Sequence, residues 1–218
     1  MKITYIHHSG VMVELENCVL LFDYWKGKLT FPENKPRYIF ISHSHHDHYN
    51  PEVFAMGGEV IADEGIMHQG KTQIHSLKPG DKLALDELNI SAFGSTDEGV
   101  SFMVETEGKR IFHAGDLNYW HWKDESTKDE VNEAKDKFEM EIAKIPKVKV
   151  DLAMFPVDAR IGSDFDLGAL MYINQFKPAY FLPIHFSAHP EKVDVFARKA
   201  EVFTNVLRAD QGIAIFEI

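Results

Sequence analysis

The stretch Ser42-His43-Ser44-His45-His46-Asp47-His48-Tyr49-Asn50 carries the strongest chemical signal in the chain. Its spacing is His-x-His-x-Asp-His, and imidazole nitrogen and carboxylate oxygen are ligands that bind divalent ions such as zinc. A histidine tract that binds metal loosely is usually monotonous, whereas here a carboxylate interrupts the histidines. The stretch therefore predicts a metal site.

Signals of regular secondary structure bracket this stretch. It follows Arg37-Tyr38-Ile39-Phe40-Ile41, whose β-branched and aromatic residues predict a buried strand. Asn50 and Pro51 then supply a helix N-cap and a proline at the first helical position. The candidate ligands are therefore expected in a strand-to-helix loop, at the end of a sheet.

Length and composition define the setting of this site. The chain has 218 residues, of which 44% are hydrophobic, and this is enough for one large core, so we expect a single domain over residues 1–218. The formal charge of -11 disfavours a broad electropositive surface, so nucleic acid is not an expected partner. The one cysteine, Cys18, lies in an apolar run and is expected to be a small buried hydrophobe without a catalytic role.

The N-terminus and the hydropathy pattern bear on location. From Met1 to Ile6 the chain has a strand-like pattern without the features of a signal peptide, and no apolar run has the length of a membrane span. We therefore expect a cytoplasmic protein that does not enter a membrane.

Alternation and turn residues predict two runs of strands, together with several helices. In the first run the expected strands are 3–7, 11–16, 18–22, 37–41 and 59–61. A second, mostly antiparallel run comprises 82–85, 88–93, 99–106 and 109–113, with Glu107-Gly108 as a tight hairpin turn. Later strands are expected at 150–155, 179–184 and 212–218. Helices are expected at 51–56, from the capping box of Thr127 and Glu130 through Ile142, at 165–176 and at 190–199, with a loosely helical stretch ending at Met67.

Polar residues directly follow three further strands. Asp23 is expected either to cap a turn or to orient the histidine loop from behind. Asp116 follows a strand that breaks at Gly115, and His185 follows the strand 179–184. Both are therefore candidate ligands at a sheet edge.

Other histidines are less informative. His7 and His8 lie at the first turn, and strand alternation directs only one of the pair toward the ligand edge, without indicating which. We expect each of them to be a satisfied structural histidine, and we assign no role to His121.

Aromatic and basic residues near these strand ends suggest contacts with a substrate. Trp120 and Trp122 follow Asp116, and they either anchor the next helix or form the wall of a substrate pocket. Arg160 follows the strand 150–155 and either contacts an anionic group of the substrate or forms a surface ion pair.

Taken together, the histidine motif, then Gly115-Asp116, then Pro183-Ile184-His185, each at a strand end, resemble the metallo-β-lactamase superfamily of metal-dependent hydrolases. Within it the chain is similar to small bacterial members related to the L-ascorbate-6-phosphate lactonase branch. The resemblance covers essentially the whole chain. It implies an α/β (α+β) fold, a four-layer αββα sandwich of two mixed sheets with helices on the outer faces and a binuclear site at one edge.

The resemblance also implies a set of ligands for two metal ions. His43 and His45 would hold the first ion, Asp47, His48 and His185 the second, and Asp116 would bridge both, with Asp23 supporting the histidine loop. The superfamily usually supplies a third histidine to the first ion, but residues 93–99 contain none. Asp97 is the best substitute, with Glu98 and His113 as alternatives. The expected ions are two Zn²⁺, with Mn²⁺ or Fe²⁺ as alternatives.

This ligand set predicts a hydrolase. A metal-bound hydroxide would attack an ester, lactone or phosphoester bond of a small anionic cytoplasmic metabolite, with Asp47 and Asp116 as the catalytic carboxylates. Asp47 would also carry a proton to the leaving group. The alternatives are a phosphodiesterase or nuclease of the same superfamily, or a non-catalytic metal-binding protein with a degenerate first site.

Overall fold

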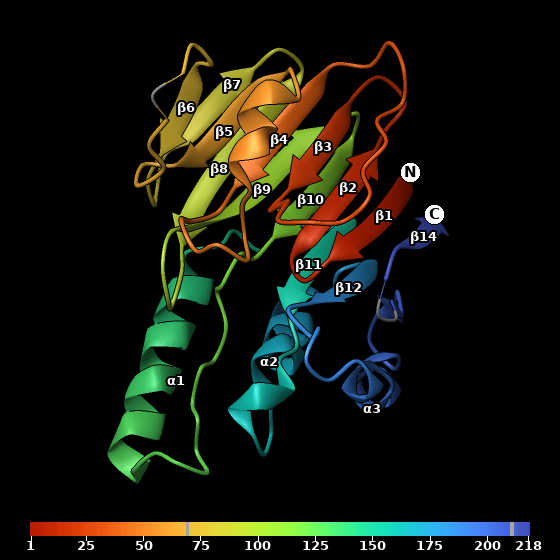
Figure 1. Cartoon of the computed structure of the whole chain (residues 1–218). Coiled ribbons are helices and arrows are strands. Elements are labelled where there is room, and N and C mark those ends of the chain that lie inside the picture. The colour runs from red at the N-terminus through yellow and green to blue at the C-terminus, as the bar shows by residue number, and fades with distance from the viewer. Residues whose placement is uncertain (69, 210–211) are drawn as a thin grey trace.

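Two mixed β-sheets form the body of the protein. The structure, a computed structural model, describes residues 1–68, 70–209 and 212–218, and within these ranges each sheet has seven strands (Figure 1). The first sheet has the order β14-β1-β2-β3-β4-β5-β6. Its strands are β1 (Lys2–His7), β2 (Gly10–Glu14), β3 (Val19–Phe22), β4 (Arg37–Ile41), β5 (Glu59–Asp63), β6 (Ile74–Leu77) and β14 (Ala214–Glu217).

The second sheet has the order β13-β12-β11-β10-β9-β8-β7. Its strands are β7 (Lys82–Leu85), β8 (Leu88–Gly94), β9 (Val100–Thr106), β10 (Lys109–His113), β11 (Leu152–Pro156), β12 (Tyr180–Ile184) and β13 (Asn205–Val206).

Both sheets change from antiparallel to parallel pairing at the same point in their order. Pairing is antiparallel from β14 to β3 and parallel from β3 to β6. In the second sheet it is antiparallel from β7 to β10 and parallel from β10 to β13. Because parallel strands of a sheet end at the same edge, the residues after β3 and β4 lie together, as do those after β10, β11 and β12.

The main core fills the space between the two sheets. Phe40 of the first sheet stacks on Phe22 with ring centroids 4.7 Å apart, and meets Phe102 of the second sheet edge-on at 5.4 Å. All three rings are fully buried. Since burying a phenylalanine side chain contributes about 1.5–3 kcal/mol, contacts of this kind hold the two sheets face to face.

The helices cover the outer faces unequally. The three α-helices are α1 (Lys128–Ala143), α2 (Leu167–Phe176) and α3 (Glu191–Ala200), and their apolar residues pack on the second sheet. Figure 1 shows them gathered below the sheets. The first sheet is covered by the short helix η1 (Pro51–Ala55) and by loop residues. A second short helix, η2 (Ala159–Ile161), follows β11.

The predicted sandwich of two mixed sheets is confirmed, and most predicted elements are present. The capping box at Thr127 and Glu130 is confirmed, because Thr127 Oγ1 accepts from the Glu130 amide and the Glu130 carboxylate accepts from the Thr127 amide. The helix predicted to end at Met67 was wrong, because the residues after β5 form a turn and then an irregular segment. Strands β6 and β13 were missed, and the helix at 51–56 is a 3-10 helix.

Among the described residues, the structure contains no helix that is both long and apolar enough to cross a membrane. The cytoplasmic location stays a prediction, as does the single-domain organisation.

Candidate metal centre

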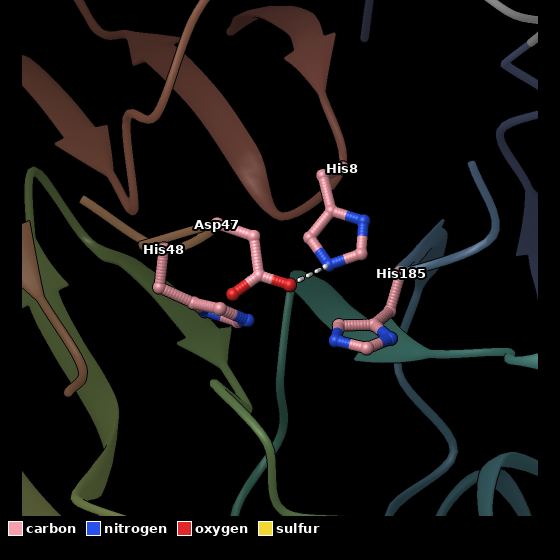
Figure 2. Close-up of side chains that lie close together, drawn as sticks. All are labelled: His8, Asp47, His48 and His185. Carbon is pink, nitrogen blue, oxygen red and sulfur yellow. Dashed lines mark ion pairs between the residues drawn. The ribbon is translucent and has the colours of Figure 1, made fainter. Parts of the chain in front are cut away.

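The candidate ligands lie where strands end at one edge of the sandwich. The loop with Asp47 and His48 follows β4, Asp116 follows β10 and His185 follows β12. His8 lies in the turn between β1 and β2. Figure 2 shows the side chains of His8, Asp47, His48 and His185, which come from three separate segments and point toward one another.

Unusual backbone conformations direct several of these side chains inward. His8, Asp23 and His185 have φ values of 57°, 42° and 64°, in the left-handed region that favours glycine. Such a conformation costs about 1–3 kcal/mol and persists only where the surrounding structure enforces it. Three strained residues at strand ends of one edge are therefore typical of a functional site.

Two glycines let the loops of both sheets approach closely. A Cβ on Gly99 would lie 2.0 Å from the Ser42 carbonyl oxygen, and one on Gly115 would lie 2.8 Å from Ser42 Cβ. The Val100 amide donates to the same Ser42 carbonyl at 3.0 Å. The start of the histidine loop is thus held directly against the segments before β9 and after β10.

A first group of donor atoms forms around His43. His43 Nε2 lies 3.1 Å from His45 Nδ1 and 3.5 Å from Asp116 Oδ2. Ligand atoms of His45, Asp97 and Asp116 also lie within 4.8 Å of one another. Asp97 therefore occupies the place where the sequence lacks a histidine.

The two alternatives to Asp97 are placed differently. Glu98 Oε2 lies 3.5 Å from His45 Nε2, the ring nitrogen other than the one that approaches His43. His113 is buried, and its Nε2 lies 3.0 Å from the Ser9 carbonyl while its Nδ1 accepts from the Gly115 amide at 3.1 Å. Both nitrogens of His113 are therefore used, and His113 was a wrong candidate for the third ligand.

A second group forms around Asp47 and the histidine that follows it. Ligand atoms of His8, Asp47, His48 and His185 all lie within 4.8 Å of one another. Asp116 Oδ1 lies 3.1 Å from His48 Nε2 and 3.4 Å from His185 Nε2. Since its Oδ2 faces His43, the Asp116 carboxylate lies between the two groups.

Hydrogen bonds behind the ligands fix which ring nitrogen faces the site. Asp23 Oδ2 lies 2.8 Å from His48 Nδ1 and accepts from Ser42 Oγ at 2.6 Å, while its Oδ1 accepts from the Ser42 amide. Ser42 Oγ also lies 2.9 Å from His43 Nδ1. Because the hydroxyl proton goes to Asp23, the His43 ring donates through Nδ1, and both imidazoles present Nε2 to the site.

Asp158 fixes the orientation of the His185 ring in the same way. Its Oδ2 lies 2.8 Å from His185 Nδ1, which again leaves Nε2 toward the site. Arg160 Nε donates to both carboxylate oxygens of Asp158, at 3.0 and 2.9 Å. The Arg160 side chain is 48% exposed, so its charge is held beside the site and remains accessible from outside.

The electrostatic environment prepares two imidazoles for ligation. Burial lowers the pKa of His8 and the pKa of His43, each to about 4. Both rings are therefore uncharged at neutral pH, the state in which imidazole binds metal.

Charge attraction lowers the pKa of the Asp116 carboxyl. Burial raises the pKa of Asp116, but the neighbouring His185 and His48 outweigh it and hold the pKa of its carboxyl far below the usual range. Conversely, burial lowers the pKa of His48, but Asp116 and Asp23 outweigh it and raise the pKa to about 10. A proton and a divalent ion therefore compete for His48 Nε2.

The donor atoms fit divalent metal ions. His8 Nε2, His48 Nε2 and Asp116 Oδ1 are buried and make no hydrogen bond of good geometry within the described part of the chain, although His48 Nε2 and Asp116 Oδ1 lie 3.1 Å apart as an ion pair. An unsatisfied buried polar atom costs about 1–3 kcal/mol, so several in one place require a common partner. Donors around a tetrahedral zinc ion lie roughly 3.3 Å apart, and the separations of 3.1–3.5 Å given above match this value.

The predicted aromatic contact, Trp120, lies next to the site. Its Nε1 donates to the Asp116 carbonyl at 2.8 Å, and its ring lies 5.6 Å from that of His185. Trp120 also lines a hollow with residues of α1, including Ala134. Both interpretations of this residue, as helix anchor and as pocket wall, therefore remain open.

The predicted metal ligands all belong to three overlapping sets of atoms that could hold an ion: His43, His45, Asp47, His48, Asp97, Asp116 and His185. Their role as ligands stays a prediction. His8 was expected to be structural, yet its side chain belongs to the second group. The signal in the sequence was its place at a strand end, but alternation alone did not distinguish it from His7.

The chain is similar in sequence to a known protein family and to proteins of other organisms. The Beta-lactamase superfamily domain family matches residues 2–132, more than half of the chain. A metal-dependent hydrolase of Pelotomaculum thermopropionicum is 26% identical over 87% of this chain and 86% of its own length. One of Nanoarchaeum equitans is 27% identical over 98% of this chain and 99% of its own length.

Solved structures show the same fold at lower identity. Igni18, a metallo hydrolase from Ignicoccus hospitalis, matches with a TM-score of 0.69 and 20% identity over the whole length of both chains. The metallo-β-lactamase fold protein YhfI from Bacillus subtilis matches with a TM-score of 0.65 and 15% identity over 99% of each chain.

Proposed function

The chain belongs to the metallo-β-lactamase superfamily, and on that basis we propose that it is a metal-dependent hydrolase with a binuclear site. The proposed reaction is hydrolysis of an ester, lactone or phosphoester bond in a small anionic metabolite. The observation that carries the proposal is the convergence at one sheet edge of buried imidazole and carboxylate atoms that make no hydrogen bond of good geometry with the described residues.

The proposed ligands divide between two ions. His43, His45 and Asp97 would hold the first and Asp47, His48 and His185 the second, with Asp116 shared. When bound, the ions would supply Lewis acidity, which lowers the pKa of a water towards about 7 and stabilises charge that develops on the substrate oxygen. Zn²⁺ is the first candidate, and the two carboxylates of the first site make Mn²⁺ or Fe²⁺ the alternatives.

The protein's own residues orient this chemistry. Asp116 stays ionised because His185 and His48 lower its pKa, so it offers one oxygen to each group. Asp47 faces His8 and His48, which hold the pKa of its carboxyl below the usual range, and its side chain is 26% exposed. The lowered pKa keeps Asp47 ionised, the state in which a carboxylate binds a metal ion, and its exposed part can reach the leaving group to which we propose that it carries a proton.

Two residues support an anionic substrate. Arg160 holds a positive charge beside His185, and Asp158 fixes its position. Trp120 offers an aromatic surface on the other side of His185. The similarity to the L-ascorbate-6-phosphate lactonase branch makes a phosphorylated lactone the first compound to test.

The test begins with metal analysis of protein purified without chelator. About two ions per chain are expected, and a panel of lactones, phosphomonoesters, phosphodiesters and thioesters is then assayed with that metal. Turnover of an anionic lactone or ester, with a Michaelis constant raised in Arg160→Ala, supports the proposal. Preference for phosphodiesters or nucleic acid would instead indicate a phosphodiesterase, and bound metal without turnover of any panel compound would indicate a metal-binding protein.

A further inference from the structure

We propose that His8 is a direct ligand of the second metal ion, together with Asp47, His48 and His185. The proposal rests on the binuclear site proposed above and adds a residue to it. It means that the imidazole missing from the first site is matched by an additional imidazole in the second.

The position of His8 supports ligation. Its ring centroid lies 4.0 Å from that of His185 and 5.6 Å from that of His48, and its Nε2 lies 3.4 Å from Asp47 Oδ2. The side chain is only 8% exposed, and Figure 2 shows the ring above the space that Asp47, His48 and His185 enclose. His8 therefore closes the side of the second group that the other three leave open.

A purely structural contact of His8 with Asp47 would be a long one, because His8 Nε2 and Asp47 Oδ2 lie 3.4 Å apart. His8 Nδ1 lies 3.1 Å from Ser187 Oγ, but Nε2 is buried without a hydrogen-bond partner in the described part of the chain. If Nδ1 carries the ring proton, Nε2 is an electron-pair donor that faces another donor, the Asp47 carboxylate. Two electron-pair donors at this separation are stabilised by a cation that binds both.

The backbone gives independent support. His8 has a φ of 57°, a conformation that most residues other than glycine avoid, and its carbonyl accepts from the His185 amide at 3.0 Å. The turn after β1 is thus fastened to the end of β12, and the strained conformation directs the ring into the site. His7, the preceding residue, has its ring 5.3 Å from Trp25 and is not a member of either donor group.

This assignment makes the two sites chemically different. The second would have three imidazoles with Asp47 and the shared Asp116, whereas the first would have two imidazoles with Asp97 and the shared Asp116. Nitrogen-rich sites favour zinc, and oxygen-rich sites favour harder ions such as manganese. The second site is therefore expected to bind zinc more tightly than the first.

The experiment is a zinc titration against a chromophoric chelator, with wild-type protein, His8→Asn and the control His7→Ala. Asparagine tolerates the left-handed backbone, so His8→Asn removes the ring with little added strain. The tighter of the two zinc affinities is expected to fall at least tenfold in His8→Asn, while the weaker one and both affinities of His7→Ala stay unchanged. The thermal midpoint is expected to fall less in chelator than in zinc, because the contact of the ring with Ser187 is lost in both conditions and its bond to the ion only in zinc.

Two further measurements separate the possible outcomes. In His8→Gly, added imidazole is expected to restore the lost zinc affinity. In wild-type protein labelled with ¹⁵N-histidine, the Nε2 resonance of His8 is expected to move on zinc addition to the position of ligated imidazole, whereas that of His7 does not. The second measurement needs no variant to fold.

Three results would overturn the assignment of His8. Unchanged zinc affinities in His8→Asn would remove His8 from the site while leaving the proposed binuclear centre intact. Equal loss of thermal stability with and without zinc would identify His8 as a structural residue. Failure of the wild-type protein itself to bind zinc, manganese or iron would overturn the proposed function together with this inference.

Discussion

Asp23 organises the site although it is not itself a candidate ligand. Its carboxylate contacts the Ser42 amide, the Ser42 hydroxyl and His48 Nδ1, and it is 1% exposed. Through Ser42 it also determines the orientation of His43. One buried carboxylate therefore fixes the ring nitrogens that two ligands present to different ions.

Replacing Asp23 should consequently weaken metal binding. Asp23→Asn keeps the volume, but it replaces one acceptor oxygen with a donor and removes the charge that orients His48. We expect zinc affinity to fall about 10–100-fold, the usual effect of losing a partner behind a ligand, measured by chelator competition.

The matched control is Asp136→Asn on the exposed face of α1. It removes the same charge far from the hydrogen bonds of the site, and zinc affinity should not change. If Asp23→Asn bound zinc as tightly as this control, the orienting role of Asp23 would be refuted.

At the scale of elements, most of the strands that were predicted from the sequence are those in which most side chains are buried. In β3 and β4 nearly every residue is buried, so an apolar run identifies them without knowledge of the partner strand. Of the four residues of β6 only Leu77 is buried, and β13 has two residues that pair with β12. Their strand conformation depends on a neighbouring strand and not on their own pattern.

The same distinction between local and long-range signals explains which residues of the site were predicted. The candidate ligands of the histidine loop lie close together in the sequence, between His43 and His48, so their chemistry is visible there. Asp116 and His185 are recognisable because each directly follows a strand. The role of His8 depends on the close approach of β1 and β12 ends from different sheets, which no local pattern encodes.

The close approach of loops at Gly99 predicts that a side chain at this position destabilises the protein. In Gly99→Ala the new methyl group would collide with the Ser42 carbonyl oxygen, and the φ of 72° would add strain. We expect the free energy of unfolding to fall by more than the roughly 1–3 kcal/mol that such a backbone conformation costs alone. Denaturant unfolding measures the change.

Gly108→Ala is the control, because Gly108 has a φ of 69° and no atom within 4 Å of an added Cβ. It carries the same backbone strain without the collision. Equal destabilisation of the two variants would show that the contact between Gly99 and Ser42 is not important for stability.

At the scale of the whole molecule, the candidate centre connects the two sheets. Asp47 and His48 follow a strand of the first sheet, whereas Asp116 and His185 follow strands of the second. The apolar core joins the inner faces of the sheets, but this edge carries buried donor atoms that make no hydrogen bond of good geometry with any residue that the structure describes. Bound ions would therefore join the sheets where the core does not.

This arrangement predicts that metal stabilises the folded protein as a whole. An ion that binds only the native state at one hundred times its dissociation constant adds about 2.7 kcal/mol. For a chain of 218 residues we expect the thermal midpoint to rise by roughly 5–10 °C in zinc relative to chelator, measured by calorimetry. Asp116→Asn should lose most of this increase, because Asp116 faces both groups, while the exposed variant Asp136→Asn should retain it. A midpoint that is the same in zinc, manganese and chelator would mean that the donor groups do not bind metal, and that the two sheets are held together by their core alone.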